Sequence, residues 1–292
     1  MKIIDVTLGS NSYSIYINNN ILSEIHNLLI QEKSNKILLI SQYNIMELIG
    51  FDLIEKLNSE DFDANFITLP IGEAAKSVNE FNRAISQMIE LNCDRSTTVI
   101  SLGGGVVGDV AGFISSTFMR GIKYYQIPTT LLSMVDSSIG GKTGINISEG
   151  KNLIGTIYQP KGVIIDPSLL KTLPKEEVVS GLGEIIKYGA ISDIEFLNNI
   201  NKWLDDIDNF PYEKAIFKSA MIKANIVSND EREGNLRKIL NFGHTIGHAF
   251  EAYYGYNKLR HGEAISYGML CSTSISMQTN YLSSKDGLFL NG

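Results

Sequence analysis

Cysteine is scarce in this chain of 292 residues, which contains only Cys93 and Cys271. Two isolated thiols build neither a disulfide framework nor a cysteine-rich metal site, and they suit a reducing cytosol. Long apolar runs are also missing. No uninterrupted stretch reaches the ~18 residues that a membrane helix needs, and residues 1–20 lack the apolar core of a signal peptide. The sequence therefore predicts a soluble, cytoplasmic protein with no membrane partner.

An excess of basic charge is also lacking. The chain has 25 Lys and Arg against 32 Asp and Glu, for a formal net charge of -7. This balance argues against non-specific binding of nucleic acid, although a local basic pocket remains compatible with it. Hydrophobic residues make up 43% and charged residues 20%, which excludes a disordered or low-complexity protein. The length suits about two domains of roughly 100–200 residues each.

The first half of the chain alternates between strand-like and helix-like segments. A helix is predicted at Ser77–Leu91, where Ser77 and Glu80 have the spacing of a capping box. Repeated strand–helix–strand units indicate a parallel sheet with crossover helices. The expected strands are Ile3–Leu8 and Ser12–Ile17, which form an N-terminal hairpin, and Lys36–Ser41, Asn65–Leu69, Thr97–Leu102 and Gly162–Asp166.

The second half has little strand signal. Helical spacing is found in Lys175–Tyr188, Tyr212–Asp230 and Leu240–Tyr254. We therefore expect an α/β fold: a Rossmann-like parallel-sheet domain at residues 1–160, followed by a mostly α-helical domain at 161–292. Ligand sites favour the cleft between two such domains.

A glycine-rich turn follows the clearest strand. Gly103–Asp109, with the sequence GGGVVGD, runs from that strand into an apolar helix. Glycines at such a turn let backbone amides approach a diphosphate, and a helix N-terminus favours anions. The spacing is not that of the usual G-x-G-x-x-G fingerprint. The alternative is a tight turn that needs positive φ angles and binds nothing.

Three of the four histidines lie within one short window. His244 and His248 are four residues apart on a predicted helix and so share a face, and His261 precedes a second predicted helix start. With the carboxylate of Glu184, two imidazoles make a donor set for a catalytic Zn²⁺. Spacing alone favours His244 and His248 as the pair. The remaining histidine, His26, is interpreted as structural.

Cations gather in and near glycine-rich segments despite the acidic total. A lysine in such a loop often binds phosphate or carboxylate, although any single one is more commonly a solvated surface residue. The Gly141–Thr143 segment lacks the first glycine of a P-loop, which disfavours an ATPase of that type. The candidate anion-binding residues are Arg120, Lys142, Lys151, Lys187, Lys223 and Arg237.

Together these motifs closely resemble the 3-dehydroquinate synthase family of sugar-phosphate cyclases. The motifs are long, ordered and specific, and the resemblance covers nearly the whole chain. They are GEAAKS (72–77), GGGVVGDVAGF (103–113), IPTTLLSMVDSSIGGKTGIN (127–146), GKNLIGTIYQP (150–160), LKTLP (170–174), GLGEIIKYG (181–189), NDEREGNLRKILNFGHTIGHAFE (229–251) and HGEAISYGM (261–269).

The resemblance implies a bound NAD⁺, with its diphosphate on Gly105 to Asp109. It also implies one Zn²⁺ or Co²⁺ held by Glu184, His244 and His261, so that His248 becomes a hydrogen-bonding residue and not a ligand. The implied nucleotide-binding residues are Gly72, Glu73, Lys76, Gly104, Gly105, Val106, Val107, Gly108, Asp109, Thr129, Thr130, Lys142, Lys151, Leu169, Leu170, Lys171 and Thr172.

The substrate site implied by the resemblance also draws on both halves of the chain. Its residues are Asp136, Lys142, Asn152, Lys187, Lys223, Arg237, Asn241 and His248. Arg120 resembles a family arginine that reaches into the site of a neighbouring subunit, which implies a homodimer.

The implied reaction belongs to the shikimate pathway, which leads to chorismate and the aromatic amino acids. It converts 3-deoxy-D-arabino-heptulosonate 7-phosphate into 3-dehydroquinate and phosphate. A transient NAD-dependent oxidation precedes elimination of phosphate. Re-reduction, ring opening and an intramolecular aldol closure follow, so NAD⁺ is not consumed.

Two departures from the family pattern leave other interpretations open. Ile71 stands where the family often has Asp, and the chain ends at Gly292, whereas relatives continue into helices carrying a lysine that helps hold the substrate phosphate. The first alternative is a related sugar-phosphate cyclase or a metal-dependent polyol or alcohol dehydrogenase. The second is a truncated NAD-binding relic with low or no activity.

Overall fold

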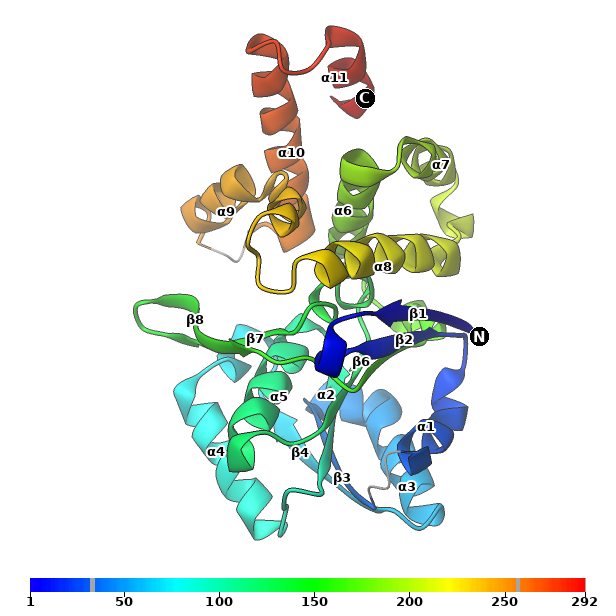
Figure 1. Cartoon of the computed structure of the whole chain (residues 1–292), viewed down its shortest axis with the longest axis vertical. Helices are drawn as coiled ribbons and strands as arrows, with labels where there is room; N and C mark the ends of the chain where they lie inside the picture. The colour runs from blue at the N-terminus through cyan, green and yellow to red at the C-terminus, as the bar shows by residue number, and fades with distance from the viewer. Residues whose placement is uncertain (32–34, 256–257, 292) are drawn as a thin grey trace. The chain divides into compact units, whose positions relative to one another are not determined.

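The computed structural model describes residues 1–31, 35–255 and 258–291, which form two compact units (Figure 1). Unit 1 spans Met1–Lys171 and unit 2 spans Thr172–Gly292. Gly292, the last residue of the predicted helical domain, lies outside the described residues.

Unit 1 is built on a seven-stranded sheet in the order β1-β2-β9-β6-β5-β3-β4. Only the N-terminal β1–β2 hairpin is antiparallel, and the other pairs are parallel, which confirms the predicted Rossmann-like sheet. The strands are β1 (Lys2–Val6), β2 (Tyr13–Ile17), β3 (Lys36–Gln42), β4 (Asp63–Leu69), β5 (Thr98–Gly103), β6 (Tyr124–Pro128) and β9 (Gly162–Ile165). A separate hairpin pairs β7 (Lys142–Ile147) with β8 (Gly150–Ile157) and extends away from the sheet (Figure 1).

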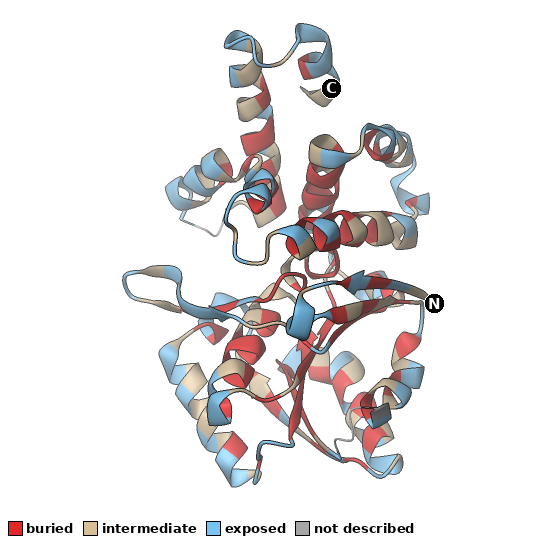
Figure 2. Ribbon diagram, in the orientation of Figure 1, coloured by how far each residue is buried: buried red, intermediate tan, exposed pale blue. Residues whose placement is uncertain are grey.

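Helices cover both faces of the sheet because alternate strand residues point to opposite sides. In β3, Leu38 and Ile40 pack into a core with α4 (Val78–Glu90) and α5 (Gly105–Thr117). Their neighbours Ile37 and Leu39 pack into a second core with α1 (Ile25–Gln31) and α3 (Phe51–Ser59). The central strands β3, β5 and β6 are almost wholly buried between these layers (Figure 2). The short helix α2 (Tyr43–Ile45) is joined to α3 by the π-helical turn η3 (Met46–Gly50).

The predicted capping box at the start of α4 is only half present. Ser77 accepts a hydrogen bond from the backbone N–H of Glu80, as the motif requires. The Glu80 carboxylate pairs instead with Arg83, one turn along the helix, at 2.6 Å. Because Arg83 binds this carboxylate, the second hydrogen bond of the capping box, from the Ser77 backbone N–H to the Glu80 side chain, is replaced by an ion pair.

The first unit continues past the expected boundary at residue 160. The β9 strand pairs in parallel with both β2 and β6, so it belongs to the sheet of unit 1. The 3₁₀ turn η7 (Pro167–Thr172) follows it, and the units divide between Lys171 and Thr172.

Unit 2 is helical throughout its described elements. Its helices are α6 (Lys175–Ser192), α7 (Ile194–Leu204), α8 (Tyr212–Asn229), α9 (His244–Tyr253), α10 (His261–Gln278) and α11 (Ser284–Asn291). The helix expected at Leu240–Tyr254 starts later. Leu240 lies in the 3₁₀ turn η9 (Leu236–Asn241), and Gly243, with φ +79°, precedes α9. Among the described residues, none of the helices combines the length and apolarity needed to cross a membrane.

Candidate metal centre and dinucleotide site

Two glycines allow α6 and α10 to cross with their backbones in contact. A Cβ on Gly262 would lie 1.9 Å from the Ser180 carbonyl oxygen, and one on Gly183 would lie 2.5 Å from the Gly262 carbonyl oxygen. The crossing is also tied by the Ser180 hydroxyl, which accepts a hydrogen bond from the Gly262 N–H at 3.1 Å. It brings Glu184, one turn after Ser180, near His261, the residue before Gly262.

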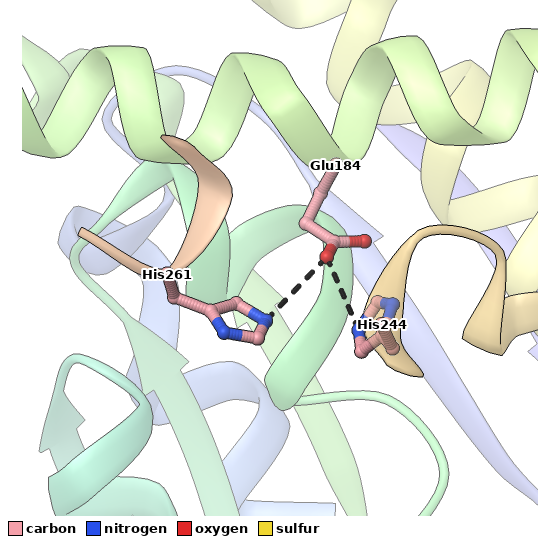
Figure 3. Close-up of side chains that lie close together, drawn as sticks. All are labelled: Glu184, His244 and His261. Atoms are coloured by element: carbon pink, nitrogen blue, oxygen red, sulfur yellow. Dashed lines mark ion pairs between the residues drawn. The ribbon is translucent and has the colours of Figure 1, made fainter. Parts of the chain in front are cut away.

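The carboxylate of Glu184 lies between two imidazoles (Figure 3). The Nε2 atoms of His244 and His261 are each 3.6 Å from Glu184 Oε1. One ligand atom from each of the three residues lies within 4.8 Å of the others. Two ligands at Zn²⁺ bond lengths in a tetrahedral shell are about 3.4 Å apart. The three residues therefore fit a divalent cation, with coordination positions left over for a substrate or water.

The other nitrogen of each imidazole faces an acceptor. His244 Nδ1 is 3.2 Å from the carbonyl oxygen of Phe242, and His261 Nδ1 is 3.3 Å from Glu251 Oε1. A carbonyl and a carboxylate can only accept, so the proton of each neutral ring belongs on Nδ1. Both Nε2 atoms then carry the lone pair that a metal requires.

Without a metal, the two imidazoles have opposite pKa shifts. Burial lowers the pKa of His244 to about 4. Burial also disfavours the charged form of His261, but hydrogen bonds to Glu184 and Glu251 outweigh it and raise the pKa of His261 to about 9. A buried carboxylate with one neutral and one protonated imidazole is a strongly polar cluster, of the kind that marks functional sites.

His248 lies beside this cluster but outside the Glu184 group. Its ring centroid is 5.4 Å from that of His244 and 5.9 Å from that of His261. Its side chain is 60% exposed, against 15% for His244, and its nearest carboxylate is that of Glu251. The i, i+4 spacing taken alone paired His248 with His244. The structure instead brings His261 to Glu184 and groups His248 with Glu251 and His261.

Three predicted anion-binding residues of unit 2 are buried. Lys187, Lys223 and Arg237 are 1%, 5% and 2% exposed. They lie on α6, α8 and η9, elements that pack against one another. Lys187 forms an ion pair with Glu184, and Arg237 donates a hydrogen bond to the Glu231 carbonyl oxygen at 2.8 Å. Arg237 Nε also lies 3.9 Å from Glu233 Oε1. Three buried cations on adjoining elements form a concentration of positive charge that suits an anionic ligand. Asn241, at the end of η9, is exposed.

Asp230 holds the loop that carries Arg237. Its carboxylate accepts backbone hydrogen bonds from Gly234, Asn235 and Arg237 at 2.7, 2.8 and 3.0 Å. These bonds, led by the one from Arg237, lower the pKa of Asp230 to about 2. The carboxylate thus positions the backbone on which the Arg237 side chain depends.

We expect Asp230→Ala to speed hydrogen exchange of the amides of residues 234, 235 and 237 at pH 7, because it removes their common acceptor. In the native chain the pKa is lowered from 3.8, so this contribution to loop order is complete above about pH 4. It is lost as the pH falls through about 2. Asp205→Ala, at an exposed carboxylate of the same unit, is the control. Unchanged exchange in Asp230→Ala would contradict the role given to this carboxylate.

The glycine-rich turn of unit 1 joins β5 to α5, as the sequence predicts, and Gly104 is the residue before the helix. None of Gly103, Gly104 and Gly105 has a positive φ, so backbone handedness does not require them. Close packing favours glycine at position 105, because a Cβ there would lie 2.8 Å from Ser137 Oγ. Ser137 Oγ and Thr129 Oγ1 are buried hydroxyls with no hydrogen-bond partner within the described part of the chain. A glycine-rich turn at a helix N-terminus, where an anion is favoured, together with two such hydroxyls fits a dinucleotide.

Three of the predicted nucleotide-binding residues, Glu73, Lys76 and Asp109, lie in one hydrogen-bonded region around Lys76. This side chain is 4% exposed, donates to Asp109 at 2.6 Å and also donates to the amide oxygen of Asn152. Asn146 links the same loops by donating to Glu73 Oε2 at 2.7 Å. The structure thus brings together Glu73, Lys76, Asp109 and the predicted substrate residue Asn152.

The remaining predicted residues of unit 1 lie in its turns, on the β7–β8 hairpin and at the start of α5. Gly72 opens the turn η4 (Gly72–Ala75) with φ +73°, and Lys142 and Lys151 are exposed on the β7–β8 hairpin. Arg120 is exposed, with φ +71° after Met119 at φ +47°, which is strained backbone for non-glycine residues. Val106, Val107 and Gly108 lie in the first turns of α5, Thr130 follows Thr129 after β6, and Asp136 is in the turn η6 (Ser133–Ser137). Leu169, Leu170 and Lys171 are in η7, which ends at Thr172, the first residue of unit 2. His26 pairs with Glu60 at 3.3 Å, in keeping with a structural role.

Sequence reasoning missed Glu251, Ser180 and Asp230. Glu251 had a usable signal, since it follows His244 and His248 by seven and three residues and so lies on the same helical face. Ser180 and Asp230 act through backbone groups far along the chain or inside an irregular loop, and no side-chain spacing indicates such contacts.

Comparison with known proteins gives matches along most of the chain. The model of the 3-dehydroquinate synthase N-terminal region matches residues 66–180, and that of the C-terminal region matches 181–288. A 3-dehydroquinate synthase of Clostridium acetobutylicum is 43% identical over 280 residues, covering 94% of this chain and 78% of the relative. One of Prochlorococcus marinus is 45% identical over 296 residues, covering 98% and 81%.

Solved structures with the same fold include two synthases. A 2-deoxy-scyllo-inosose synthase complexed with carbaglucose-6-phosphate, NAD⁺ and Co²⁺ has a TM-score of 0.89 at 24% identity, covering 99% of this chain and 81% of that one. A 2-epi-5-epi-valiolone synthase of Streptomyces hygroscopicus with NAD⁺ and Zn²⁺ bound has a TM-score of 0.83 at 25% identity, covering 96% and 80%.

Proposed function

The chain belongs to the 3-dehydroquinate synthase family, and from this we propose the substrate, the cofactors and the residue roles of its reaction. Its activity is that of a 3-dehydroquinate synthase, a lyase of the shikimate pathway. The proposed substrate is 3-deoxy-D-arabino-heptulosonate 7-phosphate, and the proposed cofactors are NAD⁺ and one Zn²⁺ or Co²⁺. The observation that carries the proposal is the cluster of Glu184, His244 and His261 inside the matched C-terminal region.

When bound, NAD⁺ would supply reversible hydride transfer, and the divalent cation would supply Lewis acidity at the substrate hydroxyls. Glu184, His244 and His261 are the residues that would hold the cation, through one carboxylate oxygen and two Nε2 atoms. Gly105 to Asp109 would receive the diphosphate at the N-terminus of α5. Thr129 Oγ1 and Ser137 Oγ support this assignment as buried hydroxyls able to bond a dinucleotide.

The buried cations of unit 2 suit a substrate with a carboxylate and a phosphate. Lys187, Lys223 and Arg237 would neutralise these anions and orient the sugar, as charge-assisted hydrogen bonds do in positioning reactants. Asp136, Lys142, Asn152 and Asn241 are the other residues proposed to bind the substrate.

His248 is proposed to hydrogen-bond the substrate and not to bind the cation. Its side chain is the most exposed of the three clustered histidines, so it can exchange protons with solvent. An imidazole at this position can hold or move a proton at a substrate oxygen while His244 and His261 keep their lone pairs on Nε2.

The enzyme is further proposed to act in the cytoplasm as a homodimer in which Arg120 reaches the partner's site. The support is the strained, exposed backbone at Met119 and Arg120, because such strain is typical of positions that present a functional side chain. Sedimentation with Arg120→Ala and native protein, beside activity assays, tests this arrangement.

We expect NAD⁺ to be recycled in each turnover. Catalytic amounts should support many turnovers, one phosphate should be released per substrate, and NADH should not accumulate. The measurement follows phosphate and absorbance at the NADH band in the same sample. Stoichiometric NADH would indicate a dehydrogenase of this fold instead, and binding of NAD⁺ with no phosphate release would indicate a non-catalytic relic.

A further inference from the structure

We propose that Glu251 is the positioning residue for His261. Its carboxylate accepts the Nδ1 proton of His261, which fixes the tautomer and the ring orientation so that Nε2 faces Glu184 and the cation. This inference rests on the proposed metal centre and adds to it a carboxylate–histidine–metal relay.

The geometry places Glu251 directly behind the ligand. His261 Nδ1 is 3.3 Å from Glu251 Oε1, and Nε2, on the other side of the same ring, is 3.6 Å from Glu184 Oε1. Glu251 is on α9 and His261 opens α10, two helices that pack against each other. Because α9 also carries His244, one helix supplies both a ligand and the support of the next ligand.

The two ligand histidines are therefore supported differently. His244 Nδ1 faces a neutral carbonyl oxygen, that of Phe242, at 3.2 Å. His261 Nδ1 faces a carboxylate that is only 15% exposed, where a charged acceptor is little screened by water. A carboxylate behind a ligating imidazole makes it a more basic ligand and holds its plane, and its removal typically weakens metal binding about 10–100-fold.

A second arrangement of the same residues has to be distinguished. His248, Glu251 and His261 also lie close enough to hold a cation of their own. In that case Glu251 would be a metal ligand. Two cations on one ring would, however, require His261 to lose both ring protons, whereas a single cation on Nε2 leaves the Nδ1 proton for Glu251.

The test measures Co²⁺ and Zn²⁺ binding by the full chain, with the visible Co²⁺ spectrum as a second readout. We expect Glu251→Ala to weaken binding about 10–100-fold and to alter the Co²⁺ bands. Glu251→Gln, whose amide oxygen still accepts from Nδ1, should lose less affinity, and its metal-free form should still unfold in one cooperative transition. Glu195→Gln, at an exposed carboxylate of the same unit, should bind as the native protein does.

Suppose that both Glu251 variants bind metal with native affinity and an unchanged Co²⁺ spectrum, while Glu184→Ala loses binding. The positioning role of Glu251 would then be overturned, and the proposed metal centre would stand. Two ions in the native chain and one in the Glu251 variants would overturn that role too, because Glu251 would then be a ligand. Native affinity in Glu184→Ala would overturn the proposed metal centre itself, and the relay with it.

Discussion

Alanine in place of His244 or His261 is expected to remove the bound metal and almost all turnover together. Each residue would supply one of three protein donors, and both Nε2 atoms lie 3.6 Å from Glu184 Oε1. Lewis-acid stabilisation is worth several kcal/mol, so the loss of rate should be on the order of 10³-fold or more. Metal content by atomic absorption and the rate of phosphate release, measured on the same samples, check this expectation.

His248→Ala is the matched variant, since it removes an imidazole from the same cluster. It should keep the metal and lose rate by about 100-fold or more, the usual loss when a group that handles protons is removed. Added Zn²⁺ should not restore the rate of this variant. A His248→Ala protein without metal, together with a His261→Ala protein that retains it, would show that the i, i+4 spacing had identified the ligands correctly.

Gly262→Ala is expected to be among the most damaging single-methyl changes in unit 2. The added carbon would lie 1.9 Å from the Ser180 carbonyl oxygen, and backbone atoms cannot move aside as a flexible side chain can. Overpacking usually costs about 1–3 kcal/mol, and contact with backbone at a helix crossing should reach or exceed the upper end of that range. Because the crossing sets the distance between Glu184 and His261, Co²⁺ binding should fail as well.

Thermal unfolding and Co²⁺ titration of Gly262→Ala check both expectations. Gly234→Ala is the control, because a Cβ there meets its nearest atom, Asp230 Oδ1, at an ordinary 3.5 Å. A Gly262→Ala protein that melts as the native chain does and binds Co²⁺ equally well would show that α6 and α10 can separate without harm to the site.

The sequence predicted the elements whose pattern is local. The apolar run of β3 and the helical spacing of α4 and α8 appear where expected, within a residue or so at their ends. The β6 strand, with Gln126 at its centre and Pro128 at its end, was missed because it alternates poorly. The β7–β8 hairpin was missed because its glycines resemble a loop, although Gly144 and Gly155 let the paired backbones approach closely.

For the candidate site too, the sequence identified residues that lie in recognisable motifs and missed those placed by tertiary contacts. Motif resemblance selected Glu184, His244 and His261, whereas spacing alone paired His244 with His248, because a helical period says nothing about a residue on another helix. His261 lies near Glu184 because α6 and α10 pack closely at their glycines. This is a tertiary contact, which residue spacing does not indicate. Glu251 and Asp230 were not singled out because their roles are exerted through another residue's ring or backbone.

Diffraction recorded on both sides of the zinc absorption edge, from crystals of the Zn²⁺-loaded protein, tests the metal centre most directly. The account predicts one anomalous peak per chain, about 2.0–2.2 Å from a Glu184 carboxylate oxygen and from Nε2 of both His244 and His261. Glu251 should contact Nδ1 of His261 and not the ion. A peak bound by His248 in place of His261, or no peak at these residues, would contradict the account.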